Sequence, residues 1–181
     1  MSKSIQTIEI ELSKKKLLLM LIGSLAFVAI GLWFIISPPI SSNSFKTNPI
    51  ILAVSGYASI LFFGVCAIFL FKKLADNKLG LIIDQKGITD NSSGVSAGEI
   101  LWCDIEDISV IKIHSQNIIM MQIKNPQDYI DRQTSPFKRR LMQMNYKMYG
   151  SPVSLTSNGL KISFDELLSI LKGKLMEYQY K

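Results

Sequence analysis

Two long uncharged apolar runs limit what this chain can fold into. Leu17–Ile36 is a run of twenty residues and Ile50–Phe71 a run of twenty-two, and neither contains a charged residue or a proline. Because a helix rises 1.5 Å per residue, each run covers about the 30 Å of a bilayer's hydrocarbon core. A soluble domain of this size has room to bury one such helix but not two. We therefore predict transmembrane helices over residues 17–36 and 50–71.

The charges that flank the two runs predict their orientation. The flanking lysines are Lys14, Lys15, Lys16, Lys72 and Lys73, whereas the connecting loop, residues 37–49, carries one basic residue. Basic residues near a span stay preferentially on the cytoplasmic side of the membrane. We therefore expect a multi-pass protein of the cell (inner, cytoplasmic) membrane, with both termini in the cytoplasm and the 37–49 loop outside. Residues 1–16 are then a cytoplasmic N-terminal segment, and residues 72–78 a basic linker.

The first run could instead be a cleaved signal peptide. Glu9 and Glu11 precede the run, and Ser37-Pro38-Pro39 follows it in place of a small-residue cleavage site, so we expect it to be retained. Small residues recur in both runs, which favours close packing within the hairpin and leaves a homo-oligomer as an alternative use. Neither run contains an ionisable side chain of the kind that ion and proton pathways need.

Composition excludes several classes of protein. The 181 residues are 48% apolar and 19% charged, which is unlike a disordered chain. Two cysteines are too few for a disulfide scaffold or a four-cysteine zinc site. The net charge of +6 gathers beside the apolar runs and in residues 127–149. This distribution favours contact with the lipid bilayer and its anionic headgroups over nucleic-acid binding.

Residues 79–181 have the pattern of short strands followed by a helix. Apolar runs alternate with turn-forming residues, and 108–113 with 118–124 predicts a hairpin around His114. Ser163-Phe-Asp-Glu166 is a capping box that begins an amphipathic helix of roughly fifteen residues. The apolar face of this helix is Phe164, Leu167, Leu168, Leu171, Leu175 and Tyr178. We predict an α+β membrane protein, in which a two-helix hairpin precedes a cytoplasmic barrel or sandwich capped by the C-terminal helix.

Two segments of this region resemble the bacterial PH-like domains. They are LGLIIDQKGITD (79–90), with its Gly87-Ile88 turn, and ILWCDIEDISVIKI (100–113), with a W-x-D-I step at residues 102–105. Two membrane helices followed by such a domain are also similar to a group of small bacterial membrane proteins. The resemblance implies a seven-stranded, helix-capped barrel over residues 79–181, with a membrane-associated binding role and no catalytic residues. Residues 127–149 depart from it as an insert.

The insert is basic and rich in methionine. Phe137, Leu141, Met144 and Met148 share one helical stripe; Arg140 lies beside it, and Lys138, Arg139 and Lys147 lie away from it. The simplest interpretation is a surface helix that packs this stripe on the barrel. A helix lying on a lipid surface and a groove for a protein partner are the alternatives. The four basic residues are our candidates for lipid or partner contact.

Motifs for chemistry are sparse. His114 is the one histidine and falls in a predicted turn, so we predict no catalytic, cofactor or metal residues and a protein that is not an enzyme. The alternative is an accessory subunit or metal-dependent membrane enzyme that uses the acids of residues 104–107, namely Asp104, Glu106 and Asp107. Our main expectation is a membrane-anchored cytoplasmic PH-like binding or scaffold module, whose partner is an unidentified membrane protein.

Overall fold

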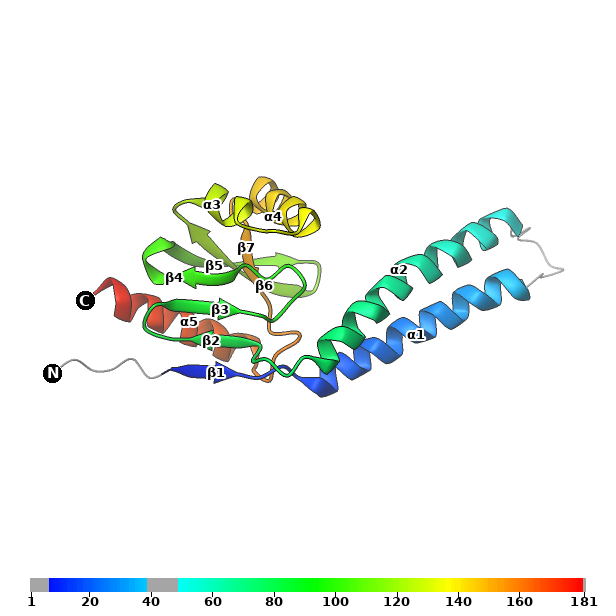
Figure 1. The fold of residues 1–181 in the computed structure, drawn as a ribbon, viewed down its shortest axis with the longest axis horizontal. Coiled ribbons are helices and arrows are strands. Elements are labelled where there is room, and N and C mark those ends of the chain that lie inside the picture. The colour runs from blue at the N-terminus through cyan, green and yellow to red at the C-terminus, as the bar shows by residue number, and fades with distance from the viewer. Residues whose placement is uncertain (1–6, 39–48, 181) are drawn as a thin grey trace. The chain divides into compact units, whose positions relative to one another are not determined.

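The computed structural model describes residues 7–38 and 49–180 (Figure 1). The chain divides into two compact units: Lys14–Asn77 form one, and the residues up to Ser13 together with those from Lys78 onward form the other. The first unit is a pair of long apolar helices, and the second contains antiparallel sheets and shorter helices. The prediction of an α+β protein with two long apolar helices is confirmed.

The helical unit consists of α1 (Lys14–Ile36) and α2 (Pro49–Ala75), which pack against one another. Both predicted runs are helical, and both helices extend past the apolar residues into the flanking lysines. The prediction of a loop over residues 37–49 falls largely on residues 39–48, which lie outside the described residues.

The first sheet is antiparallel, and its strand order is β1-β2-β3-β4. Its strands are β1 (Ile8–Ile10), β2 (Leu81–Ile83), β3 (Gly87–Asp90) and β4 (Gly98–Leu101). A 3-10 turn, Trp102–Asp104, follows β4, and the Trp102 Nε1 donates to the Asp84 carbonyl at 2.9 Å. The tryptophan of the W-x-D-I step is thus a core residue with a satisfied N–H.

The second sheet is also antiparallel, in the order β5 (Ile105–Ile113), β6 (Gln116–Ile123) and β7 (Val153–Leu155). The predicted hairpin around His114 is confirmed, and His114 adopts a positive φ of 54° in the tight turn that joins β5 to β6. After β7, Leu160 forms a single antiparallel bridge with Leu12.

The N-terminal strand was not anticipated. Our sequence boundaries set residues 1–16 apart from the folded domain, but β1 pairs with β2 through Ile8–Ile83, Glu9–Ile82 and Ile10–Leu81. The residues that follow β1 also join the domain, since the Ser13 N–H donates to the Gly159 carbonyl at 2.8 Å. The helical hairpin is therefore an insertion between two adjacent strands of one sheet.

Three helices complete this unit: α3 (Pro126–Asp131), α4 (Pro136–Tyr149) and α5 (Phe164–Gln179). The helix α4 packs on β7, and α5 packs on β5. The predicted cap of α5 is confirmed, because the Ser163 hydroxyl accepts from the Glu166 N–H at 3.3 Å. Leu167, Leu171 and Leu175 of α5 are buried, together with Leu81, Ile83, Ile88, Ile100, Ile108, Ile119, Met121 and Leu155 of the sheets.

Candidate functional site

The outer surfaces of α1 and α2 are the most unusual feature of the chain. Large apolar side chains are exposed throughout both helices, with Leu19 at 72% and Leu61 at 74%. Only 11% of the residues in the most apolar part of each helix are buried, whereas the core helix of a soluble protein is mostly buried. Both helices are long and apolar enough to cross a bilayer. An apolar surface of this extent is typical of a segment that another apolar phase covers.

Glycines bring the two helices into close contact. A Cβ added at Gly56 would lie 2.8 Å from the Gly31 carbonyl oxygen, and one added at Gly31 would lie 2.9 Å from the Gly56 carbonyl oxygen. Such distances leave no room for a side chain, so the crossing depends on both glycines. Gly31 and Gly56 thus pack the hairpin as predicted for its small residues. Gly64 does not take part in this contact, because a Cβ added there has nothing within 4 Å.

Polar groups within the pair are satisfied by neighbouring backbone. The Ser59 hydroxyl donates to the Phe27 carbonyl of the other helix at 2.9 Å, and the Ser24 hydroxyl donates to the Met20 carbonyl at 3.0 Å. The rings of Phe27 and Phe63 stack with centroids 4.3 Å apart. The Ser59 hydrogen bond and the stacked rings join α1 to α2, whereas the Ser24 hydrogen bond lies within α1.

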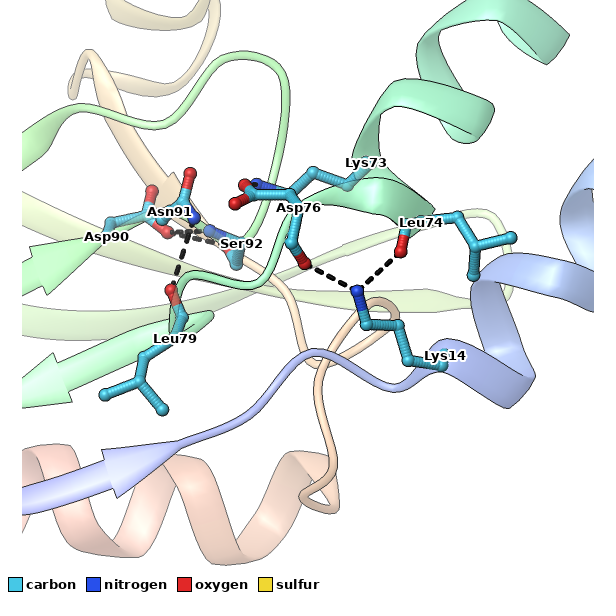
Figure 2. A network of polar contacts seen from close by, with 8 residues as sticks. All are labelled: Lys14, Lys73, Leu74, Asp76, Leu79, Asp90, Asn91 and Ser92. Atoms are coloured by element: carbon cyan, nitrogen blue, oxygen red, sulfur yellow. Dashed lines mark hydrogen bonds and ion pairs between the residues drawn. The ribbon is translucent and has the colours of Figure 1, made fainter.

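The flanking lysines, which we expected to set the topology, fall into two groups. Lys14 donates from its Nζ to the carbonyls of Leu74 and Asp76, both at 2.5 Å, and so caps the C-terminal end of α2 (Figure 2). Lys73 forms an ion pair of 3.2 Å with Asp76. A positive charge at a helix C-terminus is favourable because the free carbonyls carry negative partial charge. Lys15, Lys16 and Lys72 are exposed.

The four basic candidates of the insert occupy different environments on and around α4. Arg139 donates to the carbonyls of Asp131 and Gln133 at 3.2 and 3.1 Å, and Lys138 is half-buried. Arg140 and Lys147 are exposed. The structure therefore separates Arg139, which bonds to the local backbone, and the half-buried Lys138 from the other two basic residues, which are exposed.

The stripe that we expected α4 to bury is mostly exposed. Met142 is fully buried against the domain, but Phe137, Met144 and Met148 are exposed at 69%, 47% and 63%. Our interpretation that this stripe packs on the domain is wrong, because α4 is rotated so that Met142 is its anchor. The rotation leaves apolar side chains next to the outward-facing basic ones.

Of the three acidic residues that follow Trp102, Asp104 is part of a hydrogen-bonded network. The Tyr129 hydroxyl donates to the Asp104 carboxylate at 2.7 Å, and the Arg132 guanidinium lies 3.9 Å from the centre of the Tyr129 ring. Burial and the neighbouring Asp104 raise the pKa of Tyr129 to about 12. Glu106 and Asp107 are exposed, and within the described ranges no three His, Cys, Asp or Glu side chains gather as a metal site.

A hollow of about 350 Å³ lies beside β1 and the first turns of α5. Glu11 and Lys161 at its edge form an ion pair of 2.5 Å, and the hydrogen bond and positive charge of Lys161 lower the pKa of Glu11. Both side chains are exposed, so the pair adds little to stability. The lining is Ile8, Glu9, Ile10, Glu11, Lys161, Ile162, Glu166 and Ile170, and it contains none of the residues that sequence analysis selected for lipid, partner or metal contact.

Sequence reasoning missed two features that bear on function. One is β1, which joins the N-terminal end of the helical hairpin to the domain, so that the hairpin is connected at both ends. The other is the outward rotation of α4. The alternation of Ile8, Glu9, Ile10, Glu11 and Leu12 is a strand signal that could have revealed the first. Comparison with known protein families, curated proteins and solved structures finds no match to this chain.

Proposed function

We propose that this chain is a two-span protein of the cytoplasmic membrane that presents a non-catalytic, PH-like binding module to the cytoplasm. In this proposal α1 and α2 cross the bilayer, and the module recruits or positions a membrane protein partner. Holding a binding module at a membrane raises its effective concentration for other membrane-bound molecules without adding a contact.

The observation that carries the proposal is the pairing of β1 with β2 on either side of an apolar hairpin. Strands that share a sheet lie on the same side of a membrane, and the chain between Ile10 and Leu81 contains two helices of bilayer length. An even number of crossings is what this arrangement requires. It is also the number that the flanking lysines favour, independently of the strand pairing.

The strand pairing also bears on the alternative of a cleaved signal peptide. Cleavage after α1 would separate β1 from the rest of its sheet, although Ile10 and Leu12 are buried core residues. Retention of α1 keeps the sheet covalently intact, which supports a membrane anchor over a targeting peptide.

The PH-like part of the proposal rests on the order of elements. The described residues contain seven strands in two antiparallel sheets, followed by a capped helix that buries Leu167, Leu171 and Leu175. The resemblance of the two segments around Gly87 and Trp102 implies seven strands within residues 79–181, whereas six of the described strands lie there and the seventh is β1. The number of strands and the terminal helix are what support a PH-like domain. The inserted hairpin between β1 and β2 and the helices between β6 and β7 are departures from it.

Membrane insertion and topology are tested on the full chain. Isolated membranes are extracted with alkaline carbonate, and reporters that are active on one side of the membrane are fused at Ser42 and after Lys181. We expect the protein to resist extraction, with an external reporter at Ser42 and a cytoplasmic one at the C-terminus. Release by carbonate, or reporters on the same side, would contradict the proposal.

A further inference from the structure

The helix α4 has two chemically distinct faces, and the packed face is fixed. Met142 is fully buried, and the Asn145 side-chain amide donates to the Ser154 hydroxyl at 3.5 Å. The Ser135 hydroxyl caps the first turn, and Gly150 ends the helix in a left-handed conformation with a φ of 77°. These contacts set the rotation of α4 about its axis relative to the domain. The set of side chains that α4 exposes is therefore fixed.

The outer face of α4 consists of Phe137, Arg140, Met144, Lys147 and Met148, all of which are exposed. At about 100° per residue, the three apolar positions fall within roughly 40° of one another on the helix circumference. Arg140 lies about 40° from Met144, and Lys147, which we had placed away from the stripe, lies about 60° from Met144 on the same side. The whole group is opposite Met142. Apolar and basic side chains are therefore adjacent on one outward surface.

We propose that the outer face of α4 lies in the headgroup region of the anionic membrane in which the protein is anchored. This inference rests on the proposed function, because the two spans are what bring the domain to a bilayer. Phe137, Met144 and Met148 would enter the boundary of the acyl chains, while Arg140 and Lys147 pair with lipid phosphates. Basic residues beside bulky apolar ones are the composition by which helices lie in an interface.

Charge argues for lipid over a second copy of the chain. The sequence of α4, PFKRRLMQMNYKMY, contains four basic residues and no acidic one. Two such faces would repel each other, whereas each basic residue close to anionic lipid is attracted to it. Lys138 and Arg139 are excluded from the proposed contact, because the first is half-buried and the second is bonded to backbone carbonyls.

The inference is tested by fluorescence quenching in the full chain, reconstituted into vesicles that contain brominated lipid. Trp33 of α1 is first replaced by Phe, which leaves Trp102 as a buried internal reference. The substitution Phe137→Trp then reports on α4, and Met176→Trp at an exposed position of α5 is the matched control. We expect quenching at position 137 in vesicles rich in phosphatidylglycerol, little in phosphatidylcholine, and little at position 176 in either.

Charge variants test the role of the two basic residues. Neutralising both with Arg140→Gln and Lys147→Gln should lower the ratio of docked to undocked helix by about 30-fold, which corresponds to about 2 kcal/mol. The matched pair Lys112→Gln and Lys172→Gln removes the same charge from exposed positions on β5 and α5 and should leave quenching unchanged. Raising the salt concentration should weaken the quenching, because it screens attraction to the surface.

Each outcome decides between the two proposals. If the protein resists carbonate extraction but position 137 is unquenched, or is quenched equally in both lipids, lipid docking is overturned while anchoring stands. Quenching at position 176 as strong as at position 137 would also overturn it. If position 137 is unquenched in these vesicles but is shielded from aqueous iodide in isolated native membranes, the outer face of α4 contacts a protein there instead of lipid. If carbonate releases the protein, the anchoring proposal fails, and the inference fails with it.

Discussion

Residues 7–13 should be indispensable for folding of the domain, even though the rest of it begins at Lys78. We compare two soluble chains from which the helical hairpin is removed. One contains residues 78–180 alone, and the other joins residues 7–13 to 78–180 through a Gly/Ser linker. Ile10 and Gly80 are joined by a hydrogen bond. Ser13 lies three residues after Ile10 and Lys78 two residues before Gly80, so the distance between Ser13 and Lys78 is about 20 Å at most. A linker of about six residues spans that distance.

The expected difference follows from what β1 buries. Ile10 and Leu12 are buried, and β1 covers the edge of β2, where Leu81 and Ile83 are fully buried. Truncating a buried Ile or Leu to Ala costs about 2–5 kcal/mol, so losing Ile10 and Leu12 removes about 4–10 kcal/mol. The total stability of a domain is about 5–15 kcal/mol. The fragment without β1 should be largely unfolded or strongly destabilised.

Thermal and urea unfolding, followed by circular dichroism, measure the difference. We expect the linked chain to unfold cooperatively, and the fragment to melt at least about 15 °C lower or to show no transition. Within the linked chain, Ile10→Asp should abolish the transition, whereas Glu9→Asp at the neighbouring exposed position should not. Equal midpoints for the fragment and the linked chain would refute the assignment of β1 to the domain.

Three further substitutions test individual contacts. Gly56→Leu should destabilise the detergent-solubilised helix pair by about 1–3 kcal/mol, because the added Cβ meets the Gly31 carbonyl. Gly64→Leu is the control, since a Cβ at that position meets open space. Thermal unfolding in detergent compares the two variants. The pKa of Tyr129 is raised from 10.0 to about 12, so the folded state favours the neutral phenol. The stability that this shift contributes should be fully present below pH 10 and should fall as the pH rises towards 12. Tyr129→Phe should remove this decline in urea titrations, and should cost about 1–3 kcal/mol at neutral pH. Ser163→Ala should lower the free energy of unfolding by about 1 kcal/mol through loss of the α5 cap, read as a lower urea midpoint at unchanged slope.

Local patterns in the sequence predicted the local parts of the fold. Length and hydropathy located α1 and α2, the capping box located the start of α5, and the apolar runs around His114 located the β5–β6 hairpin. Each of these signals is contained within about twenty neighbouring residues. No sequence signal indicated the capping of α2 by Lys14, because this contact joins residues far apart in the chain.

The features that sequence reasoning missed depend on distant partners. The strand β1 has three residues, and its pairing partner follows the whole hairpin, so no local period reveals their contact. On α4, methionines lie both on the buried face, at Met142, and on the outer face, at Met144 and Met148. Hydropathy alone cannot distinguish which methionines face the domain, because the choice is made by the shape of the β7 surface.

The insertion of the hairpin between β1 and β2 also dictates an order of events as the chain leaves the ribosome. Leu81 is made about 70 residues after Ile10, which takes roughly 4–14 s at 5–20 residues per second. During that interval β1 has no partner, and its alternating isoleucines are accessible to chaperones. The bridge between Leu12 and Leu160 can form only when Leu160 has been translated. Pairing of β1 with β2 is thus a step that can occur only after both long helices have been synthesised.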